Sequence, residues 1–453
     1  MKIIRLLFLF SLLVSCSCDD KSTNSPIVNP PVALTDEELL NQVQKDALKY
    51  FVEYAHANSK LARERYHVDD VSNDANIVTT GGSGFGMMTI LVGMERNYIE
   101  KSEGLNRLTT ALNFLETADR FHGAWPHWMD GNTGNVIPFG TLDNGGDLVE
   151  TSFLCQGLLC IREYFKNGTA QEQALAQKAD QLWRGVEWDW YTKGENVLYW
   201  HWSPNYEWQM NFKLQGYNEC LITYVLAKSS PTHPISNACY NEGWARNGAI
   251  VNSSQRFNIP VIFDYNGASG NVGPMFWSHY SYMGLDPRGL TDQYADYWIL
   301  TKNHAKIMLA HCVANYLGFP EYSDKCWGLT ASYTRNADGS TGYTAHQPNN
   351  DRGVISPTAA LSSFPYTPVE SMKFLRYLYE ERKDKYVGVA GPYDAFSPRF
   401  DWVTKRYLAI DQGTIVPMIE NFRTGMLWNL FMNAPEIETG LLSLGFHSTQ
   451  HGF

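Results

Sequence analysis

Apolar residues recur at helical spacing through most of the chain after residue 35. In the first such stretch, Leu39, Val43 and Ala47 lie four positions apart, as they would on one face of an α-helix. Thr35 and Glu38 precede them in the spacing of a capping box, which begins many helices. Alternation of apolar and polar residues with hairpin turns, typical of strands, is scarce. The pattern predicts helices near residues 35–51, 84–99, 105–118, 147–165, 171–186, 217–228, 292–317, 368–381 and 417–432.

Long connections separate these helices, notably 122–146, 187–215, 229–290 and 328–366. Loops of that length are uncommon in compact domains unless they are functional. No Pro/Gly/Ser-rich linker or charge run divides residues 35–453 into smaller units. We therefore expect an all-α fold in one large domain, an (α/α)6 toroid whose loops build a cleft at one end.

The first residues resemble an export signal. Lys2 and Arg5 precede the apolar run 6–14, which is shorter than the ~20 residues that a membrane-spanning helix needs. Leu13-Val14-Ser15-Cys16 matches a bacterial lipobox, although an ordinary cleaved signal that ends near a cysteine is the alternative. The sequence predicts a signal peptide (1–15), a lipidated Cys16 with a flexible tether (16–34) and a catalytic domain (35–453). The protein would then be an exported lipoprotein in the periplasm or at the outer-membrane surface, held to the membrane only by its lipid.

Charge and composition narrow the classes of partner. The formal net charge is -11, and loss of Lys2 and Arg5 with the signal would make it -13. Because phosphate contacts need clustered Lys and Arg, a nucleic-acid partner is excluded. The 14 Trp and 26 Tyr suit a cleft that stacks aromatic rings on sugars, although a large aromatic core would account for most of them.

Several common cofactor motifs fail. The run Gly81–Gly86 lacks the spacing of a dinucleotide fingerprint, a P-loop or a nucleophile elbow, so we expect close backbone approach there. No C-x-x-C or H-E-x-x-H occurs, so no metal site is expected. Small buried roles are expected for Cys155, Cys160 and Cys220, whereas Cys239, Cys312 and Cys326 could pair after export.

Three carboxylates are candidates for acid–base chemistry. Asp147 and Glu150 lie three positions apart at the start of a predicted helix, which places them on one face with Cβ atoms ~5–6 Å apart. They could also simply favour the helix dipole. Glu219, at the start of another apolar helix, either caps that helix or lies in a polar cleft.

Polar and aromatic clusters suggest a sugar-binding surface. His127 and Trp128 combine a stacking plane with polar tips, and so does the sequence Trp200-His201-Trp202. Charged side chains within otherwise apolar sequence are rarely left unpaired. Glu420 and Arg423 could therefore form a structural ion pair instead of binding sugar. The substrate-binding candidates from these clusters are His127, Trp128, Trp202, Asp286, Arg288, Asp411, Glu420 and Arg423.

Long stretches of the chain resemble the bacterial glucoamylase-like toroids that include endo-β-1,2-glucanases and sophorose-processing hydrolases. The matching stretches include VSNDANIVTTGGSGFGMMTILVGMERNYI, GAWPHWMD, DLVETSFLCQGLL, LYWHWSPNYEWQMNFKLQGYNECLITYVLAKSSPTHPI, MFWSHYSYMGLDPRGLTDQYADYW, CWGLTASY, GVISPTAALSSFPYTP and AIDQGTIVPMIENFRTGMLW. The similar domain of cyclic β-1,2-glucan synthases is a weaker match. One departure is GPYDAF at 391–396, which is shorter than the usual Gly-aromatic version of this family.

The resemblance implies an (α/α)6 toroid without metal or organic cofactor that hydrolyses a neutral β-1,2-glucan with inversion. It implies catalytic roles for Asp147, Glu150 and Glu219, and the matched stretches add Trp277 and Trp327 as substrate-binding candidates. An inverting pair of carboxyls lies ~6.5–9.5 Å apart on opposite sides of the scissile bond. Because Asp147 and Glu150 share a helix face, we expect Glu219 to be one essential acid or base.

Other functions are weighed against this one. A non-catalytic glycan-binding lipoprotein would explain the aromatic residues and the anchor, and a hydrolase of another glucan linkage would keep the acids. A polysaccharide lyase fits poorly, because its anionic substrate would meet a chain of net charge near -13. The expectation is a monomeric glycoside hydrolase of a neutral glucan.

Overall fold

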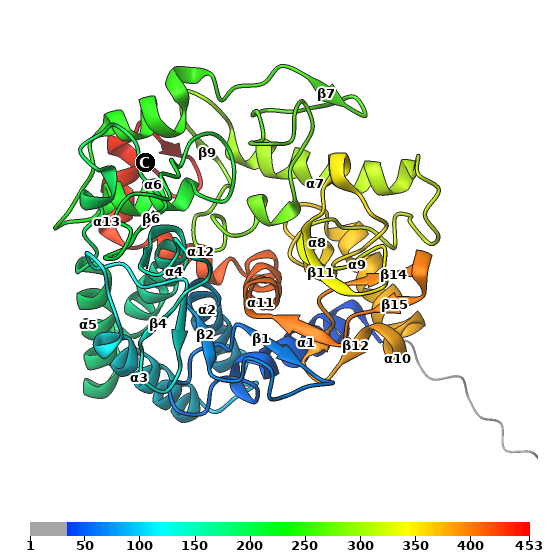
Figure 1. Ribbon diagram of the computed structural model, residues 1–453, viewed down its shortest axis with the longest axis horizontal. Helices are drawn as coiled ribbons and strands as arrows, with labels where there is room; N and C mark the ends of the chain where they lie inside the picture. The colour runs from blue at the N-terminus through cyan, green and yellow to red at the C-terminus, as the bar shows by residue number, and fades with distance from the viewer. Residues whose placement is uncertain (1–33) are drawn as a thin grey trace, which may run out of the picture. The chain divides into compact units, whose positions relative to one another are not determined.

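Helices are the main regular element of the structure (Figure 1), a computed structural model that describes residues 34–453. The first helix begins at the predicted capping box, where Glu38 N–H donates to Thr35 Oγ1 at 3.2 Å and Thr35 N–H donates to Glu38 Oε2 at 2.8 Å. The α-helices are α1 (Asp36–Val52), α2 (Thr80–Glu95), α3 (Lys101–Thr117), α4 (Leu148–Phe165), α5 (Ala170–Arg184), α6 (Leu221–Ser229), α7 (Tyr297–Ala314), α8 (Pro357–Leu361), α9 (Pro368–Arg376), α10 (Lys383–Tyr386), α11 (Ala409–Arg423), α12 (Met426–Met432) and α13 (Pro435–Ser443).

Several predicted helices have shifted ends: α2 and α3 each begin four residues before the expected start, and α7 begins five residues after it. Two further differences bear on the site. The stretch expected as one helix at 417–432 is divided between α11 and α12, because Gly425 has φ 72° and Asn421 Oδ1 caps the second helix by accepting from Leu427 N–H. The helix expected from residue 217 begins only at Leu221. Glu219 therefore lies in the turn that leads into α6.

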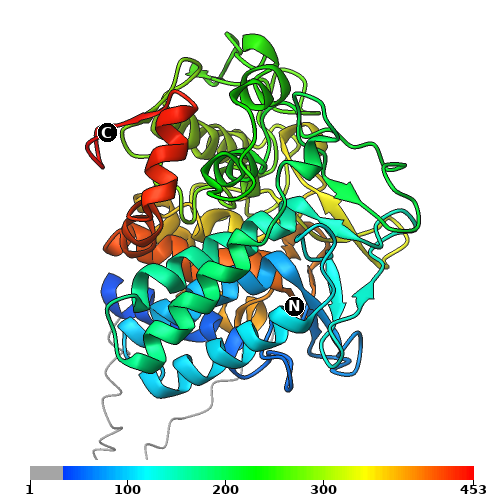
Figure 2. The ribbon, with the colours of Figure 1, turned by 90° about the vertical axis from the view of Figure 1, so that its left-hand side faces the viewer.

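Strands among the described residues are short and form two- or three-stranded ribbons, with no closed sheet. All of these pairs are antiparallel, and several ribbons gather on the right-hand side of Figure 2. The strands are β1 (Arg65–His67), β2 (Ile77–Thr79), β3 (Trp128–Asp130), β4 (Val136–Ile137), β5 (Gly146–Asp147), β6 (His201–Trp202), β7 (Gln255–Arg256), β8 (Ile259–Pro260), β9 (Leu290–Thr291), β10 (Ala331–Arg335), β11 (Thr341–Ala345), β12 (Val387–Gly388), β13 (Gly391–Pro392), β14 (Phe396–Ser397), β15 (Trp402–Val403), β16 (Arg406–Leu408) and β17 (His447–Ser448).

The helices differ in how much of their surface is buried. Nearly every residue of α2, α4 and α11 is buried, whereas α1, α3 and α5 bury one face and expose the other. Glycines let two of the buried helices approach closely. A Cβ at Gly84 would lie 2.4 Å from Phe153 O, and one at Gly157 would lie 2.5 Å from Gly84 O. The glycine run in α2 therefore serves the close helix packing expected from the sequence.

The six cysteines within the described residues are buried free thiols: Cys155, Cys160, Cys220, Cys239, Cys312 and Cys326. Burial raises the pKa of Cys155 to about 12. Searched from residue 34 to the end, the structure has no helix that is both long and apolar enough to span a bilayer. The predicted signal peptide and Cys16 lie outside the described residues, as does the tether up to residue 33.

Candidate active site

A cavity of about 370 Å³ lies where the starts of α4 and α6 meet the β1, β3 and β10–β11 ribbons. Its wall is mostly aromatic, and ionisable side chains reach it from several separate parts of the chain. The cavity is lined by Glu64, Arg65, His127, Trp128, Phe139, Glu150, Phe153, Trp200, Glu219, Phe276, Tyr280, Ala331, Tyr333, Tyr343, Leu408 and Ile410. Predicted site residues from 127, 150 and 219 are thus brought together by the fold.

Asp147 does not line this cavity and is the N-cap of α4. Its Oδ1 accepts hydrogen bonds from the N–H groups of Val149 and Glu150, both at 2.9 Å. Its Oδ2 lies 3.0 Å from His127 Nδ1 and accepts from Trp200 Nε1–H at 3.0 Å. The side chain is fully buried, and four donors use the acceptor capacity of its carboxylate. Asp147 therefore fixes the positions of His127 and Trp200 and does not itself face the cavity.

Glu150 lies one turn further along α4 and does reach the cavity. Its Oε2 accepts from Gly81 N–H at 2.7 Å and from Thr79 Oγ1–H at 3.3 Å, while Oε1 lies 3.9 Å from His127 Nε2. A Cβ at residue 81 would lie 2.5 Å from Oε2, so glycine is needed there. Burial raises the pKa of Glu150 to about 7, against the opposing effects of His127 and these donors.

Glu219 enters the same cavity from the turn before α6. Ser281 Oγ–H donates to the Glu219 carbonyl at 2.5 Å, which ties this turn to the segment 275–282. Burial raises the pKa of the Glu219 carboxyl to about 7, and the negative charges of Glu150 and Asp147 add to this effect. Among the described residues, no Lys, Arg or His forms an ion pair with Glu219. Its environment therefore favours the protonated form.

His127 joins the carboxylates into one network, which includes Asp143. Burial lowers the pKa of His127, but Glu150, Asp143 and Asp147 more than offset this, so it lies well above its usual value. Asp143 Oδ2 lies 3.7 Å from His127 Nδ1, and its Oδ1 lies 3.0 Å from His201 Nε2. Burial raises the pKa of Asp143, but the two histidines outweigh burial and lower it to about 2. The three carboxylates thus favour the protonated, positively charged form of His127.

Asp143 and Glu64 were missed by the sequence analysis. Asp143 lies in a long predicted connection just before Asp147, and that proximity was the available signal. Glu64 lies between Arg63 and Arg65, which gives it the pattern of a solvated charge run. In the structure Glu64 lines the cavity, and burial raises its pKa although Arg65 Nε–H bonds to its carboxylate.

A second pair of acids lies behind the aromatic wall. Asp411 Oδ1 accepts from Tyr280 Oη–H at 3.2 Å, and Asp394 Oδ2 accepts from Tyr333 N–H at 2.8 Å. Burial raises the pKa of Asp394 to about 6, while burial and the neighbouring Asp394 raise that of Asp411 well above its usual value. Asp411 was expected to bind substrate, but it is 2% exposed and does not line the cavity. Asp394 comes from the segment 391–396, which the sequence comparison with the family singled out.

His127, Asp143 and Asp147 form the one described group with the spacing of metal ligands, since one ligand atom from each lies within 4.8 Å of the others. The four donors on Asp147 leave no free lone pair for a cation. The raised pKa of His127 also opposes metal binding, because a metal needs the neutral imidazole. These residues suit proton chemistry better than a metal.

Three tryptophans expected to bind substrate lie away from the cavity. Trp327 is fully buried in the hydrophobic core, so the prediction for it is wrong. Trp277 is half-buried and stacks on Tyr265 with ring centroids 6.0 Å apart. Trp202 packs edge-on against Trp190 at 6.1 Å. Trp327 and Trp277 therefore pack in or against the core. The apolar sequence around them is the same for a core residue and for a residue that binds a sugar.

Four charged residues expected to bind substrate form structural ion pairs instead. Asp286 is fully buried and pairs with Arg288 at 2.7 Å and with His451 at 3.1 Å. Glu420 pairs with Arg96, with both bonds at 2.9 Å, and not with Arg423. Arg423 instead donates to the side chains of Glu37, Asn41 and Gln44. Because Asp286 and Glu420 are buried in these ion pairs, the substrate-binding predictions for them are wrong, and so is the alternative Glu420–Arg423 pair. Arg288 and Arg423 are partly buried and do not line the cavity, and their binding roles stay predictions.

Comparison with known proteins places this geometry among carbohydrate-active enzymes. Residues 211–435 match the Glycoamylase family model, described as "Putative glucoamylase". An endo-β-1,2-glucanase from Chitinophaga pinensis, solved with sophorotriose and glucose, is 55% identical with a TM-score of 0.89, over 92% of this chain and 99% of that one. An endo-β-1,2-glucanase mutant from Talaromyces funiculosus, solved with β-1,2-glucan, shares the fold at 13% identity and a TM-score of 0.66, over 91% of each chain.

A curated relative is longer than this chain. It is an exo β-1,2-glucooligosaccharide sophorohydrolase (non-reducing end) from Parabacteroides distasonis, 42% identical over 441 residues. The alignment covers 93% of this chain and 59% of the relative. The chain thus spans under two thirds of that enzyme but nearly all of the Chitinophaga pinensis structure.

Proposed function

The chain belongs to the Glycoamylase family, and from this premise we propose that it is a glycoside hydrolase that cleaves β-1,2-glucan with inversion. The observation that carries the proposal is the pair Glu150 and Glu219, two carboxyls with pKa near 7 in one aromatic cavity. Two groups that titrate near neutral pH suit general acid–base catalysis. The relatives at 42% and 55% identity, which act on β-1,2-glucans, support the linkage.

In this proposal Glu219 donates the proton to the leaving oxygen. Its pKa is raised by burial and by negative neighbours, with no ion-pair partner among the described residues to stabilise the carboxylate. Glu150 serves as the base that activates water. His127 at 3.9 Å and the Gly81 N–H at 2.7 Å both favour its ionised form. Both carboxyls have a pKa of about 7, and only Glu150 has a cationic neighbour, which suits Glu150 as the base and Glu219 as the acid.

Asp147 and Asp143 support these two groups through His127. Asp147 bonds His127 and Trp200, so it positions the base-side imidazolium and one aromatic wall residue. Asp143 keeps a second negative charge beside the imidazole. In this arrangement Asp147 is a positioning residue, because its oxygens are occupied by four donors and do not reach the sugar.

We also propose that the helices form an (α/α)6 toroid. The contrast between the nearly fully buried α2, α4 and α11 and the amphipathic α1, α3 and α5 supports alternating inner and outer helices. The α11 helix lies near the middle of the view in Figure 1. Loops between such helices would then frame the cavity that contains Glu150 and Glu219.

The substrate proposal is tested by incubating the protein with linear β-1,2-glucan and measuring new reducing ends, with starch in parallel. We expect short oligosaccharides from β-1,2-glucan and little product from starch. Chromatography of the products separates release of disaccharides from internal cleavage. Glucose released from starch at a comparable rate, with β-1,2-glucan intact, would contradict the proposal.

We further propose that Cys16 carries lipid and anchors the enzyme to a membrane. The support is the basic residues and apolar run before Leu13-Val14-Ser15-Cys16. A multiply acylated cysteine gives stable anchoring where one chain is marginal. Cys16→Ala should move the protein from the membrane fraction to the soluble fraction, measured by fractionation and immunoblotting. Cys18→Ala is the matched control and should leave the distribution unchanged, and retention of the Cys16 variant in the membrane would disprove the anchor.

A further inference from the structure

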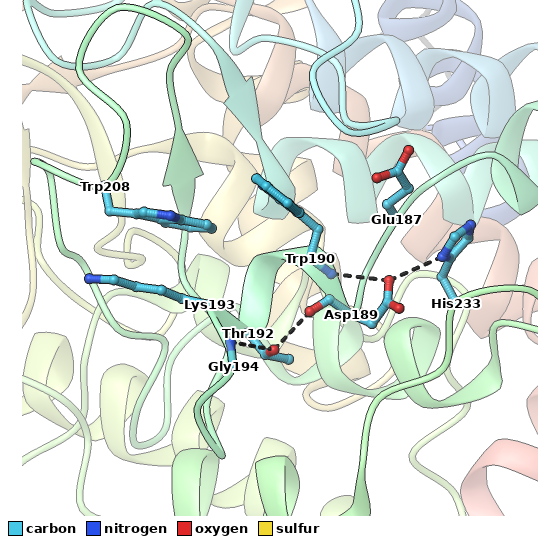
Figure 3. Close-up of a pocket in the computed structure, with 8 residues that line it drawn as sticks. All are labelled: Glu187, Asp189, Trp190, Thr192, Lys193, Gly194, Trp208 and His233. Carbon is cyan, nitrogen blue, oxygen red and sulfur yellow. Dashed lines mark hydrogen bonds and ion pairs between the residues drawn. The ribbon is translucent and has the colours of Figure 1, made fainter.

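A second pocket, of about 510 Å³, lies outside the cavity described above (Figure 3). The two share no lining residue. In Figure 3, Trp190 lies between Trp208 on one side and Glu187 and His233 on the other. The pocket is lined by Glu187, Asp189, Trp190, Thr192, Lys193, Gly194, Trp208 and His233. The proposed reaction uses none of them.

The aromatic part of this pocket is exposed but rigidly supported. Trp190 is 40% exposed, although it is among the largest apolar side chains. One face of its indole stacks on His122 with ring centroids 3.6 Å apart, and Trp202 packs edge-on at 6.1 Å. Trp208 extends the surface at 6.3 Å and 31° to Trp190. A fixed indole open to solvent is suited to stacking against the C–H face of a sugar ring, which is flat and partly apolar.

The polar groups around the rings are mixed in charge. Glu187 pairs with His122 at 3.0 Å, and Asp189 pairs with His233 at 3.1 Å. Lys193 Nζ lies 6.0 Å from the centre of the Trp208 ring. These groups offer donors and acceptors without a strong excess of either charge. Such a surface suits the hydroxyl groups of a neutral glycan better than a polyanion, which needs clustered positive charge.

Strand β6 connects the two regions. Successive side chains of a strand point to opposite faces. His201 lies 3.0 Å from Asp143 in the acid network, while Trp202 packs against His122 and Trp190. The second pocket and the acid network therefore lie on opposite sides of the β5–β6 ribbon, and strand β6 contributes one side chain to each.

We propose that this pocket is a separate binding site for a neutral glucan chain, which holds a part of the polymer that does not occupy the catalytic cavity. The inference rests on the proposed β-1,2-glucanase function for the identity of the glucan. A site of this kind raises the affinity for long chains by making a second contact on the same molecule. Short oligosaccharides that fill only the catalytic cavity gain nothing from it.

The test compares Trp190→Ala with the wild-type enzyme on long linear β-1,2-glucan and on the trisaccharide sophorotriose. Loss of one aromatic stacking contact should raise KM for the polymer by about tenfold, with kcat unchanged. KM and kcat for the trisaccharide should stay at the wild-type values. Trp190→Phe, which keeps an aromatic ring, should recover most of the affinity. Tyr316→Ala is the matched control, because Tyr316 is 80% exposed and lines neither pocket.

An unchanged KM for the polymer in Trp190→Ala would overturn the inference. Equal losses on polymer and trisaccharide would also overturn it, because they would assign Trp190 to the catalytic cavity or to the fold. Native gels that contain the polymer give a reading independent of hydrolysis. Retardation of the wild-type protein that weakens in Trp190→Ala supports the site even when no product forms, and in that case only the proposed hydrolysis fails.

Discussion

The carboxyls of the catalytic cavity and those of the ion pairs elsewhere in the fold are all shielded from solvent, Glu219 less than the others, but their pKa values shift in opposite directions. Glu420 is 1% exposed, and burial alone would raise its pKa, yet Arg96, Thr424 and Gln44 lower it overall. Asp286 is fully buried and its pKa is lowered by His451 and Arg288 against burial. Glu150 and Glu219 have pKa values near 7. Burial raises the pKa of the carboxyl in both regions, and the strength of its ion-pair partner decides whether the final pKa lies above or below the ordinary value.

The largest effect is expected from removing the carboxyl of Glu219, which has no cationic partner among the described residues. Glu219→Gln keeps the size and most hydrogen bonds of the side chain but cannot donate the acid's proton. We expect kcat on β-1,2-glucan to fall by ~10²–10⁴-fold, the range typical of general acid–base catalysis. Thermal unfolding should show a protein at least as stable as the wild type. Near wild-type turnover in this variant would remove Glu219 from the mechanism and make Glu64, which also lines the cavity, the next candidate.

The matched variant removes the carboxylate of Glu420, which is paired with the guanidinium of Arg96. Glu420→Gln leaves Arg96 with a neutral partner and should lower the free energy of unfolding by about 2 kcal/mol, since a broken buried ion pair leaves an uncompensated charge. Arg96 is partly exposed, which keeps the loss below that of a fully buried pair. Urea denaturation measures the stability, and turnover per folded molecule should stay at the wild-type level. Loss of turnover in a folded, stable Glu420 variant would break the comparison.

The smallest effect is the pH dependence of stability. The pKa of Glu219 is about 7 in the folded protein against an ordinary value of 4.5, so the unfolded chain releases this proton at lower pH. Its contribution therefore lowers the free energy of unfolding as pH rises from about 4.5 to about 7, and it levels off above that. Asp143, with a pKa of about 2, acts in the opposite sense, and its contribution is lost as pH falls from about 3.8 toward 2.

Glu219→Gln should therefore flatten the decline in stability between pH 4.5 and 7, by about 1–2 kcal/mol. Denaturant midpoints across this range provide the measurement, with Glu420→Gln as a control that keeps the decline. A variant with the same pH slope as the wild type would show that Glu219 titrates normally. In the wild type, kcat/KM should also fall above about pH 7 as Glu219 loses its proton.

Local patterns predicted much of the helical structure and part of the site. The helix starts at Thr35 and Asp147 follow from side chains that cap the next few N–H groups, an interaction decided within four residues. His127, Trp128, Glu150 and Glu219 do line the cavity. Trp327 and Asp286 were misassigned because an aromatic or charged residue in apolar sequence has the same pattern in a core as in a cleft.

The amino-acid sequence by itself determined the approximate position of most long helices, which helix faces are apolar and why α2 and α4 approach closely at their glycines. Only the tertiary structure decided which acids have a cation. Arg96 reaches Glu420 across 324 positions of sequence, and Gly81 reaches Glu150 across 69. A carboxyl's pKa depends on burial and on charges within a few ångströms, whichever part of the chain supplies them. Because such neighbours come from distant segments, the difference between Glu219 and Glu420 arises only when the helices pack.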